Sequence, residues 1–460
     1  MENSVKKNGN VVAIVVMFFI YGMIAFVTNL AAPIGTIWGN QFEGNSVLGM
    51  MGNMMNFLAY LFMGIPAGNL LVKIGYKKTA LWALAVGTVG LFVQYLSSFV
   101  GIDTVVMNYS STTAEGVATT FPITLNFFIY LLGAFICGFC VCMLNTVVCP
   151  MLNLLGGGGN KGNQLLQFGG ALNSFSGTMT PFFVGALIGV LSKNTMMSAV
   201  TPLLFIGMGI FITAFVILIF MPIPEPNQTG VRKVKYAHSP WNFRHTVLGV
   251  VGIFFYVGIE IGIPGTLNFY LADQSARGAE VTGEASAIAG TIVAIYWLLM
   301  LVGRTLSGFI SGAVSSKTQL TFVSATAIIL IMLAIFLPKT TTISVPEAIY
   351  SGGAQVPVSA FLLVLCGLCT SIMWGGIFNL AVEGLGKYTA QASGIFMMMV
   401  VGGGVMPLIQ NGIANAVGYM ASYWLVIAML AYLLFYGLVG SKNVNTDIPV
   451  EEEEVDPRNL

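Results

Sequence analysis

The sequence contains very little charge. Only 8% of its 460 residues are Asp, Glu, Lys or Arg, whereas soluble domains carry about 25%. Hydrophobic residues make up 56% of the chain, and the mean hydropathy is +0.87. This composition predicts a polytopic membrane protein, and the net charge of +1 gives no sign of a nucleic-acid partner.

Groups that support catalysis are also scarce. The two histidines, His238 and His245, lie at a polar connection in the middle of the chain, and no carboxylate pair occurs within an apolar run. The motifs CGFC and CGLC have redox-type spacing, but both lie in apolar runs, where cysteines usually serve packing. We therefore predict no enzyme activity, no catalytic residue, no metal site and no cofactor. The absence of charged rings also argues against a channel.

Long apolar runs fill most of the chain, and a helix crosses a bilayer with about 20 residues. They predict an all-α membrane protein with twelve transmembrane helices in two pseudo-symmetric six-helix bundles. The predicted spans are 11–38, 46–72, 79–99, 122–152, 163–192, 200–222, 245–272, 285–312, 318–338, 356–383, 388–415 and 420–440. The predicted domains are an N-terminal bundle (1–222), a cytoplasmic linker (223–244), a C-terminal bundle (245–441) and an acidic cytoplasmic tail (442–460).

Basic residues are distributed unevenly between the loops. If both termini lie in the cytoplasm, all but three of the 18 Lys and Arg residues fall on that side, the exceptions being Lys193, Arg277 and Lys339. An excess of basic residues marks the cytoplasmic side of a membrane protein. We therefore predict a multi-pass protein of a bacterial inner membrane, with both termini in the cytoplasm and loops 100–121 and 340–355 outside.

The two halves of the sequence resemble each other. The segment ICGFCVCMLNTVVCPMLN aligns with LCGLCTSIMWGGIFNLAV, and Asn29 and Glu260 each precede a proline by four residues. These matches have nearly the same offset along the chain, which indicates a duplication of six helices, as in many transporters. On this alignment Asn29 corresponds to Glu260, and Asn145 corresponds to Trp374.

Glu260 is an acidic residue deep inside an apolar run, GVVGIFFYVGIEIGIPGTLNFYL. A carboxylate at membrane depth is costly and is a functional-site hypothesis by default. The position favours a residue that couples transport to a proton, because burial disfavours the charged form and allows a proton to exchange. A sodium ion held by Glu260, Asn29 and backbone carbonyls near Pro264 is the rival interpretation. A neutral carboxyl that holds helices together is the simplest alternative.

Several sequence blocks resemble a known family. After the second span, GNLLVKIGYKKTAL matches the loop signature of the major facilitator superfamily at Gly68, Gly75, Lys77 and Lys78, with Val72 at the usual acidic position. The blocks TNLAAPIG, LNTVVCPMLNLLG, LNSFSGTMTP, FFYVGIE and VVGGGVMPLIQNGIAN resemble, in this order, the fucose–galactose–glucose:cation symporter family of that superfamily. The resemblance implies the major facilitator fold and import of a neutral hexose or deoxyhexose by alternating access.

The chain departs from the proton-coupled members of that family, which carry acids in spans one and four where this sequence has Asn29 and Asn145. Asparagine can hydrogen-bond a sugar hydroxyl but cannot titrate. The resemblance therefore ranks proton coupling through Glu260 first. The alternatives are a sodium-coupled symporter and a uniporter in which Glu260 binds sugar hydroxyls; an exporter of drugs or metabolites is a weaker one.

Polar and aromatic side chains in the predicted spans supply the substrate-binding candidates. They are Asn29, Asn145, Gln167, Asn173, Glu260, Asn268, Trp374 and Asn379. The resemblance places span five along the cavity, which favours Gln167 and Asn173, and the indole of Trp374 suits stacking on a sugar ring. Amides in membrane helices also serve as contacts between helices, which is the alternative for each of them.

Basic and acidic residues at the cytoplasmic ends of the spans are the gating candidates. They are Arg304, Glu383, Lys77 and Lys78. Arg304 and Glu383 are expected to form a gate or a helix-end salt bridge. The predicted partners are a small neutral sugar and the lipid bilayer, and the protein is expected to be a monomer.

Overall fold

The computed structural model describes residues 2–30, 34–35, 37–38, 41–42, 46–112, 118–188, 195–221, 223, 238–273, 276–281, 285–347 and 353–450. Part of the predicted linker (223–244) and part of the predicted tail (442–460), including its EEEEVD run, lie outside the described residues. The predicted domain boundaries therefore stay predictions.

Helices make up most of the described chain. They are α1 (Glu2–Asn29), α3 (Ser46–Leu96), α4 (Leu125–Leu155), α5 (Gly159–Leu187), α6 (Thr201–Phe220), α7 (Arg244–Ala272), α8 (Ala285–Ile310), α9 (Ser316–Phe336), α10 (Val358–Thr370), α11 (Met373–Val382), α12 (Thr389–Met398), α13 (Gly402–Val417) and α14 (Tyr419–Phe435). Helix is the expected form because backbone N–H and C=O groups find no water in lipid and must bond within the segment.

Ten segments of the described chain are helical and apolar over a length that crosses a membrane. α3 is 51 residues long and covers the predicted span 46–72 and the predicted span 79–99 up to Leu96, with a turn at Gly75, where φ is 84° and ψ is 173°. Glycine adopts this backbone conformation without the strain that a Cβ would cause. The predicted span 356–383 is divided into α10 and α11 at Ser371 and Ile372. The count of twelve spans stays a prediction.

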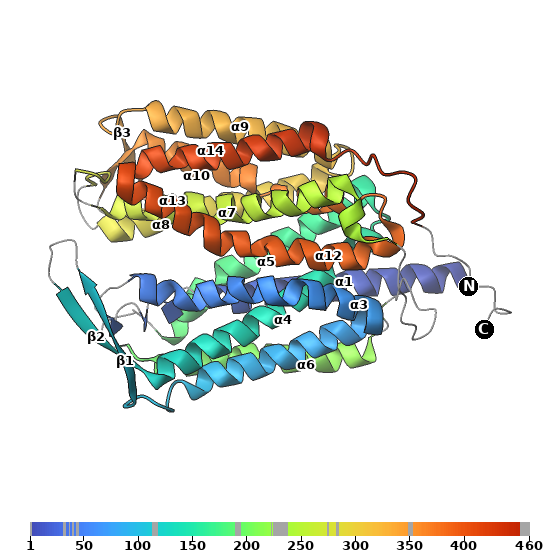
Figure 1. Ribbon diagram of the computed structural model, residues 1–460, viewed down its shortest axis with the longest axis horizontal. Coiled ribbons are helices and arrows are strands. Elements are labelled where there is room, and N and C mark those ends of the chain that lie inside the picture. Colours follow the sequence, from blue (N-terminus) through green and yellow to red (C-terminus); the bar gives the residue numbers. More distant parts are fainter. Residues whose placement is uncertain are drawn as a thin grey trace.

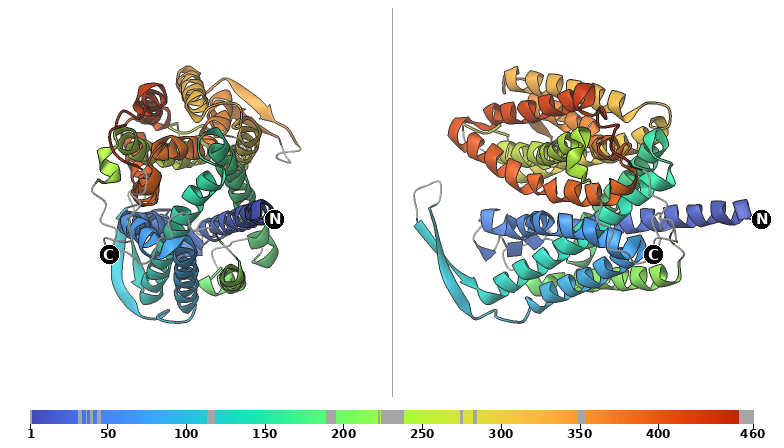
Figure 2. Two further views of the ribbon diagram at one scale, coloured as in Figure 1. Left: turned by 90° about the vertical axis from the view of Figure 1, so that its right-hand side faces the viewer. Right: turned by 45° about the vertical axis from the view of Figure 1, so that its right-hand side comes forward.

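The helices form two groups that run roughly along one axis. Figure 1 shows α1, α3, α4 and α6 together in the lower part and α7–α10, α13 and α14 in the upper part, and Figure 2 shows the same division from two other sides. α5 and α12 lie where the groups meet, since α5 packs against α8 and α12 packs against α3. We name helices α1–α6 the first half and helices α7–α14 the second half.

Backbone atoms of the two halves approach each other closely at α3 and α12. A Cβ atom on Gly68 would lie 2.9 Å from the Cα atom of Gly394, so neither position has room for a side chain. Next to this contact, the Ser393 hydroxyl donates a hydrogen bond of 3.3 Å to the carbonyl of Thr146 in α4. Pro150, four residues later, has no N–H for this carbonyl, which leaves it available to the other half.

The predicted loops 100–121 and 340–355 contain strands, so an all-α description is incomplete. β1 (Val105–Thr112) pairs antiparallel with β2 (Ala118–Thr124), and β3 (Thr342–Val345) pairs with β4 (Ala354–Pro357). Both segments are rich in Val, Thr and Ile, which favour strands outside helices. Figure 1 shows both hairpins at one end of the molecule, opposite the end where α1 begins.

Candidate functional site

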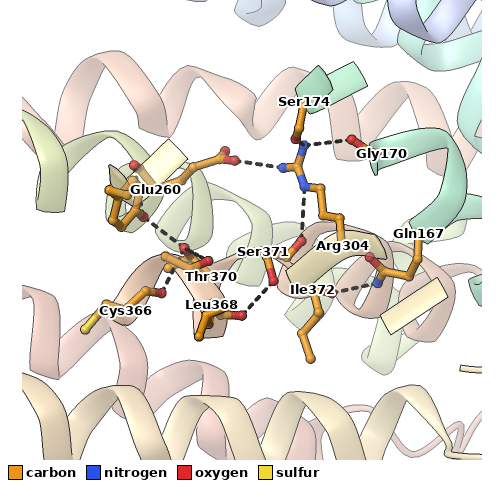
Figure 3. A network of polar contacts seen from close by, with 12 residues as sticks. Gln167, Gly170, Ser174, Glu260, Arg304, Cys366, Leu368, Thr370, Ser371 and Ile372 are labelled. Atoms are coloured by element: carbon orange, nitrogen blue, oxygen red, sulfur yellow. Dashed lines mark hydrogen bonds and ion pairs between the residues drawn. The ribbon is translucent and has the colours of Figure 1, made fainter. Parts of the chain in front are cut away.

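Glu260 forms an ion pair with Arg304. Glu260 lies near the middle of α7, and its Oε1 atom is 3.0 Å from Nη2 of Arg304 on α8 (Figure 3). The side chains of Glu260 and Arg304 are only 14% and 11% exposed. A pair so removed from water is favourable only when further hydrogen bonds satisfy both groups.

Arg304 has these further bonds. Its Nε donates to the carbonyl of Ser371 at 3.1 Å, and its Nη1 donates to Oγ of Ser174 at 2.7 Å and to the carbonyl of Gly170 at 3.3 Å. Ser371 belongs to the turn between α10 and α11, whereas Gly170 and Ser174 belong to α5. One guanidinium thus joins three parts of the chain around Glu260.

The sequence predicts Arg304 and Glu383 at the cytoplasmic ends of their spans, but the structure places the guanidinium of Arg304 in the interior. The gating role of the two residues stays a prediction. Arg304 pairs with Glu260 in the interior, whereas the side chain of Glu383 is exposed just after α11. The backbone carbonyl of Glu383 lies 3.0 Å from Nε2 of His245. The physical reason is that an arginine six residues before the end of α8 can turn its long side chain toward α7 as easily as toward water.

The backbone of Glu260 is also part of the site. Pro264 lacks an N–H and therefore leaves the Glu260 carbonyl without its helical hydrogen bond. The hydroxyl of Tyr296 donates to this carbonyl at 3.4 Å and lies 2.9 Å from Oγ1 of Thr370. α7, α8 and α10 are thereby connected at the level of the ion pair (Figure 3).

Two buried polar groups stand next to the ion pair. The hydroxyl of Tyr256, one turn before Glu260 on α7, lies beside Glu260 and Arg304 but makes no hydrogen bond of good geometry among the described residues. The ring of Tyr256 is 6.2 Å from that of Trp374. Nε1 of Trp374 is buried beside the weak acceptor Cys149 and makes no hydrogen bond of good geometry within the part of the chain that the structure describes. Tyr256 is not among the candidates predicted from the sequence, although four-residue spacing places it on the same helix face as Glu260.

Three predicted amides bond to other parts of the protein. Gln167 donates to the carbonyl of Ile372 at 2.9 Å, next to the Ser371 carbonyl that Arg304 uses (Figure 3). Asn173 donates to the carbonyl of Tyr21 at 2.8 Å, and Asn145 donates to the hydroxyl of Tyr60 at 3.0 Å. Gln167 therefore borders the ion-pair site, whereas Asn173 and Asn145 hold neighbouring helices together in this arrangement.

The remaining predicted amides lie apart from the ion pair. Asn29 ends α1, and its amide bonds to the carbonyl of Ala25 in the same helix at 2.8 Å. Asn268 lies two turns beyond Glu260 on α7 and is partly exposed. Asn379 accepts a hydrogen bond of 2.6 Å from Asn153 and donates one of 2.9 Å to Ser316, which connects the ends of α4, α11 and α9. Asn379 thus joins the two halves.

Lys77 and Lys78 differ in their surroundings. Nζ of Lys77 donates to the carbonyls of Ile219 and Met221 at 2.8 and 2.9 Å, at the end of α6, whereas Lys78 is exposed. A cation is favourable at a helix C-terminus, where carbonyls lack partners. Lys77 therefore connects two helices of the first half, and its gating role stays a prediction.

We expect Lys77→Met to lower the free energy of unfolding by about 1 kcal/mol, because the last carbonyls of α6 lose a charged donor. Lys78→Met is the matched control and is expected to change it by less than about 0.5 kcal/mol, as for other surface substitutions. Thermal unfolding of the purified protein in detergent measures both. Equal effects of the two substitutions would contradict this role of Lys77.

The site as a whole offers hydrogen bonds without net charge. Glu260 and Arg304 neutralise each other, Tyr256 and Trp374 add a phenol and an indole N–H, and the Trp374 ring packs on Phe396 with centroids 5.9 Å apart. A few polar groups in apolar surroundings are typical of sites for small molecules. This combination suits a neutral substrate that carries several hydroxyl groups and an apolar face.

The chain matches the Major Facilitator Superfamily over residues 14–406 and belongs to this superfamily. It is therefore a multi-pass membrane transporter by family and fold. Among its relatives is a glucose/galactose transporter of Brucella abortus, 28% identical over 96% of this chain and 97% of that one. The L-fucose-proton symporter of Escherichia coli is 22% identical over 82% of this chain and 81% of that one.

A crystal structure of the E. coli fucose:proton symporter superposes with a TM-score of 0.71, at 17% identity, and covers 92% of this chain and 98% of that one. At this identity the likeness concerns the fold alone. The resemblance drawn from the sequence blocks is confirmed, and so is the predicted helical major facilitator fold.

Proposed function

We propose that this protein imports a neutral hexose or deoxyhexose, of the glucose, galactose or fucose class, by alternating access of a central site to the two sides of the membrane. The observation that carries the proposal is the neutralised Glu260–Arg304 pair beside Tyr256 and Trp374, which supplies donors, acceptors and an aromatic face. The names of the relatives, glucose/galactose transporters and a fucose symporter, support the same substrate class.

We further propose that the chain crosses a bacterial inner membrane twelve times as a monomer, with both termini in the cytoplasm. The distribution of basic residues supports the orientation. The turn of α3 at Gly75 supports two spans within this one long helix, because 51 residues far exceed the length that one crossing takes.

A proton is the coupling ion that the site favours. A sodium ion needs several oxygen ligands around it, as hard cations do, and at Glu260 it would meet a guanidinium 3.0 Å from the carboxylate. A proton needs a single carboxylate oxygen. The same guanidinium disfavours cationic drugs as substrates, which weakens the exporter alternative.

Sugar uptake by purified protein in liposomes tests the proposed function. Labelled D-glucose, D-galactose and L-fucose are offered under an inward proton gradient, an inward sodium gradient, or neither. We expect accumulation of at least one sugar with the proton gradient alone. Accumulation that follows only sodium would overturn proton coupling, and equal concentrations on both sides under every gradient would indicate a uniporter. Absence of uptake and exchange for all three sugars would overturn the substrate class.

A further inference from the structure

The last described residues of the chain, 441–450, run across the end of the molecule at which α7 and α12 begin (Figure 1). We name this segment the strap. It follows the π-helical turn Tyr436–Gly440 after α14, and the structure describes no helix or strand within it. Its side chains Ile448 and Val450 are nevertheless partly buried against the hydrophobic core. A segment of this kind stays in one place only if its contacts outweigh the conformational entropy that it loses.

The strap caps the first turn of α7. Oδ1 of Asn445 accepts a hydrogen bond of 2.9 Å from the backbone N–H of Arg244, the first residue of this helix. The preceding residue, Phe243, has no side-chain acceptor, whereas the first N–H groups of a helix need partners from outside it. The backbone N–H of Asn445 in turn donates to Oδ1 of Asn443 at 3.0 Å. Asn445 is therefore held in the turn of the strap while it binds α7.

The strap also binds the loop between α11 and α12, residues 383–388, which we name the α11–α12 loop. The carbonyl of Val450 accepts a hydrogen bond of 3.1 Å from the N–H of Lys387 in this loop. Gly386, next to it, has a φ of 48°, which favours glycine. A Cβ atom on Gly386 would also overlap with the carbonyl oxygen of Val450. The close approach of the strap to the loop thus depends on a glycine at this position.

The start of α7 and the α11–α12 loop also contact each other directly. Nε2 of His245 on α7 lies 3.0 Å from the carbonyl oxygen of Glu383. The ring of Phe243, just before α7, is 5.6 Å from the ring of Tyr388 at the end of the loop. The side chains of Phe243, His245 and Tyr388 are fully buried. The loop is therefore joined to α7 both by its own contacts and through the strap.

α12 lies between this loop and a place where the chain can bend. The helix begins at Thr389, directly after the loop, and ends at the 3₁₀ turn Met399–Val401, which residues 402–404, all glycine, follow. Short 3₁₀ turns and glycines within a span are common sites of bending. Between these ends α12 packs on α3, where a Cβ atom on Gly394 would lie 2.7 Å from the Cα atom of Gly68. The position of the loop therefore determines how α12 meets the first half.

We propose that the strap holds the α11–α12 loop on the start of α7 and thereby keeps α12 against α3 at this end of the molecule. When the strap is detached, the loop loses part of its attachment, α12 can turn about residues 402–404, and its contact with α3 loosens. Alternating access, as proposed above, requires the two halves to separate, and the strap favours the arrangement in which they are in contact here. The strap is thus a regulatory element that lies outside the central site and does not depend on which substrate the protein carries.

Hydrogen–deuterium exchange of the purified protein in detergent tests the inference. Asn445→Ala combined with Ile448→Ala removes the cap of α7 and one apolar contact of the strap. We expect the amides of the loop and of α12, residues 383–398, to exchange about tenfold faster, as the loss of one helix cap allows. The amides of α3 around Gly68, in the other half, are expected to exchange faster as well. The amides of α10 are the internal reference and are expected to keep their wild-type rate.

Thr446→Ala combined with Asp447→Ala is the matched control, because both side chains belong to the strap and are exposed. It is expected to exchange like the wild type. If the double variant of Asn445 and Ile448 does not fold, Asn445→Ala alone takes its place. Wild-type exchange of the loop and α12 in that variant would overturn the inference, and so would faster exchange there without a change around Gly68, or an equal effect in the control.

The remaining outcomes separate the strap from general stability and from the proposed function. Faster exchange of α10 by the same factor would indicate general unfolding and would also overturn the inference. If exchange behaves as expected but no sugar enters liposomes, the proposed function fails and this inference stands. If sugar accumulates while the exchange of α12 does not respond to the strap, the reverse holds.

Discussion

Glu260→Gln is expected to abolish accumulation of sugar against its gradient, so that the internal concentration of the labelled sugar reaches and does not exceed the external one. Exchange of labelled for unlabelled sugar is expected to continue, because the amide still accepts a hydrogen bond from Arg304 but cannot carry a proton. Accumulation under an imposed proton gradient and exchange without a gradient are measured on the same liposomes.

Asp103→Asn is the matched control, because it removes an exposed carboxylate at the hairpin end of the molecule, away from the ion pair. It is expected to accumulate sugar like the wild type. Full accumulation by Glu260→Gln would exclude Glu260 as the coupling residue. Loss of both accumulation and exchange, in a protein that unfolds at the wild-type temperature, would instead indicate that Glu260 binds the sugar.

Trp374→Ala is expected to raise KM for the transported sugar about 30-fold, with a smaller effect on the maximal rate. The substitution removes a ring that can stack on a sugar, for about 1 kcal/mol, and a buried N–H that can exchange the weak acceptor Cys149 for a sugar hydroxyl, for about 1 kcal/mol more. Together, about 2 kcal/mol corresponds to this change in affinity. Initial rates of uptake over a range of sugar concentrations give KM.

Trp374→Phe separates the two contributions, since it keeps an aromatic face and removes only the N–H. We expect it to raise KM by about fivefold, as the loss of one hydrogen bond does. Trp297→Phe is the second control: Trp297 lies on α8, is 37% exposed, and is expected to keep the wild-type KM. An unchanged KM in Trp374→Ala would remove this residue from the substrate site.

Much of the fold could be predicted from the sequence, because a helix that crosses lipid needs a long apolar run, and because the internal repeat indicates two related bundles. The exceptions are informative. The turn at Gly75 lies between the predicted spans 46–72 and 79–99, but the sequence gives no sign that one continuous helix, α3, runs through both. The division of a predicted span at Ser371 and Ile372 also left no trace in hydropathy, since the residues on both sides are apolar.

The site was predicted only in part. Glu260 is conspicuous because a carboxylate is rare within an apolar run. For Arg304 the sequence predicts the aqueous end of its helix, because its position along α8 allows two directions for the side chain. Only the packing of α5, α7 and the turn between α10 and α11 selects one of them. Most of the amides were recognised as polar groups at depth, but their partners depend on contacts between distant segments, such as Asn153 with Asn379.

The prolines inside α4 and α7 help to explain how a chain with so few charged residues holds its helices together. Pro150 and Pro264 each turn an ordinary carbonyl into a hydrogen-bond acceptor for another helix, at Thr146 and Glu260. The acceptor belongs to the main chain and is present whatever the side chain is. A chain with few ionic side chains can in this way form specific hydrogen bonds between its helices without water. Substitution of the proline would restore the helical N–H and so remove the free carbonyl on which such a bond depends.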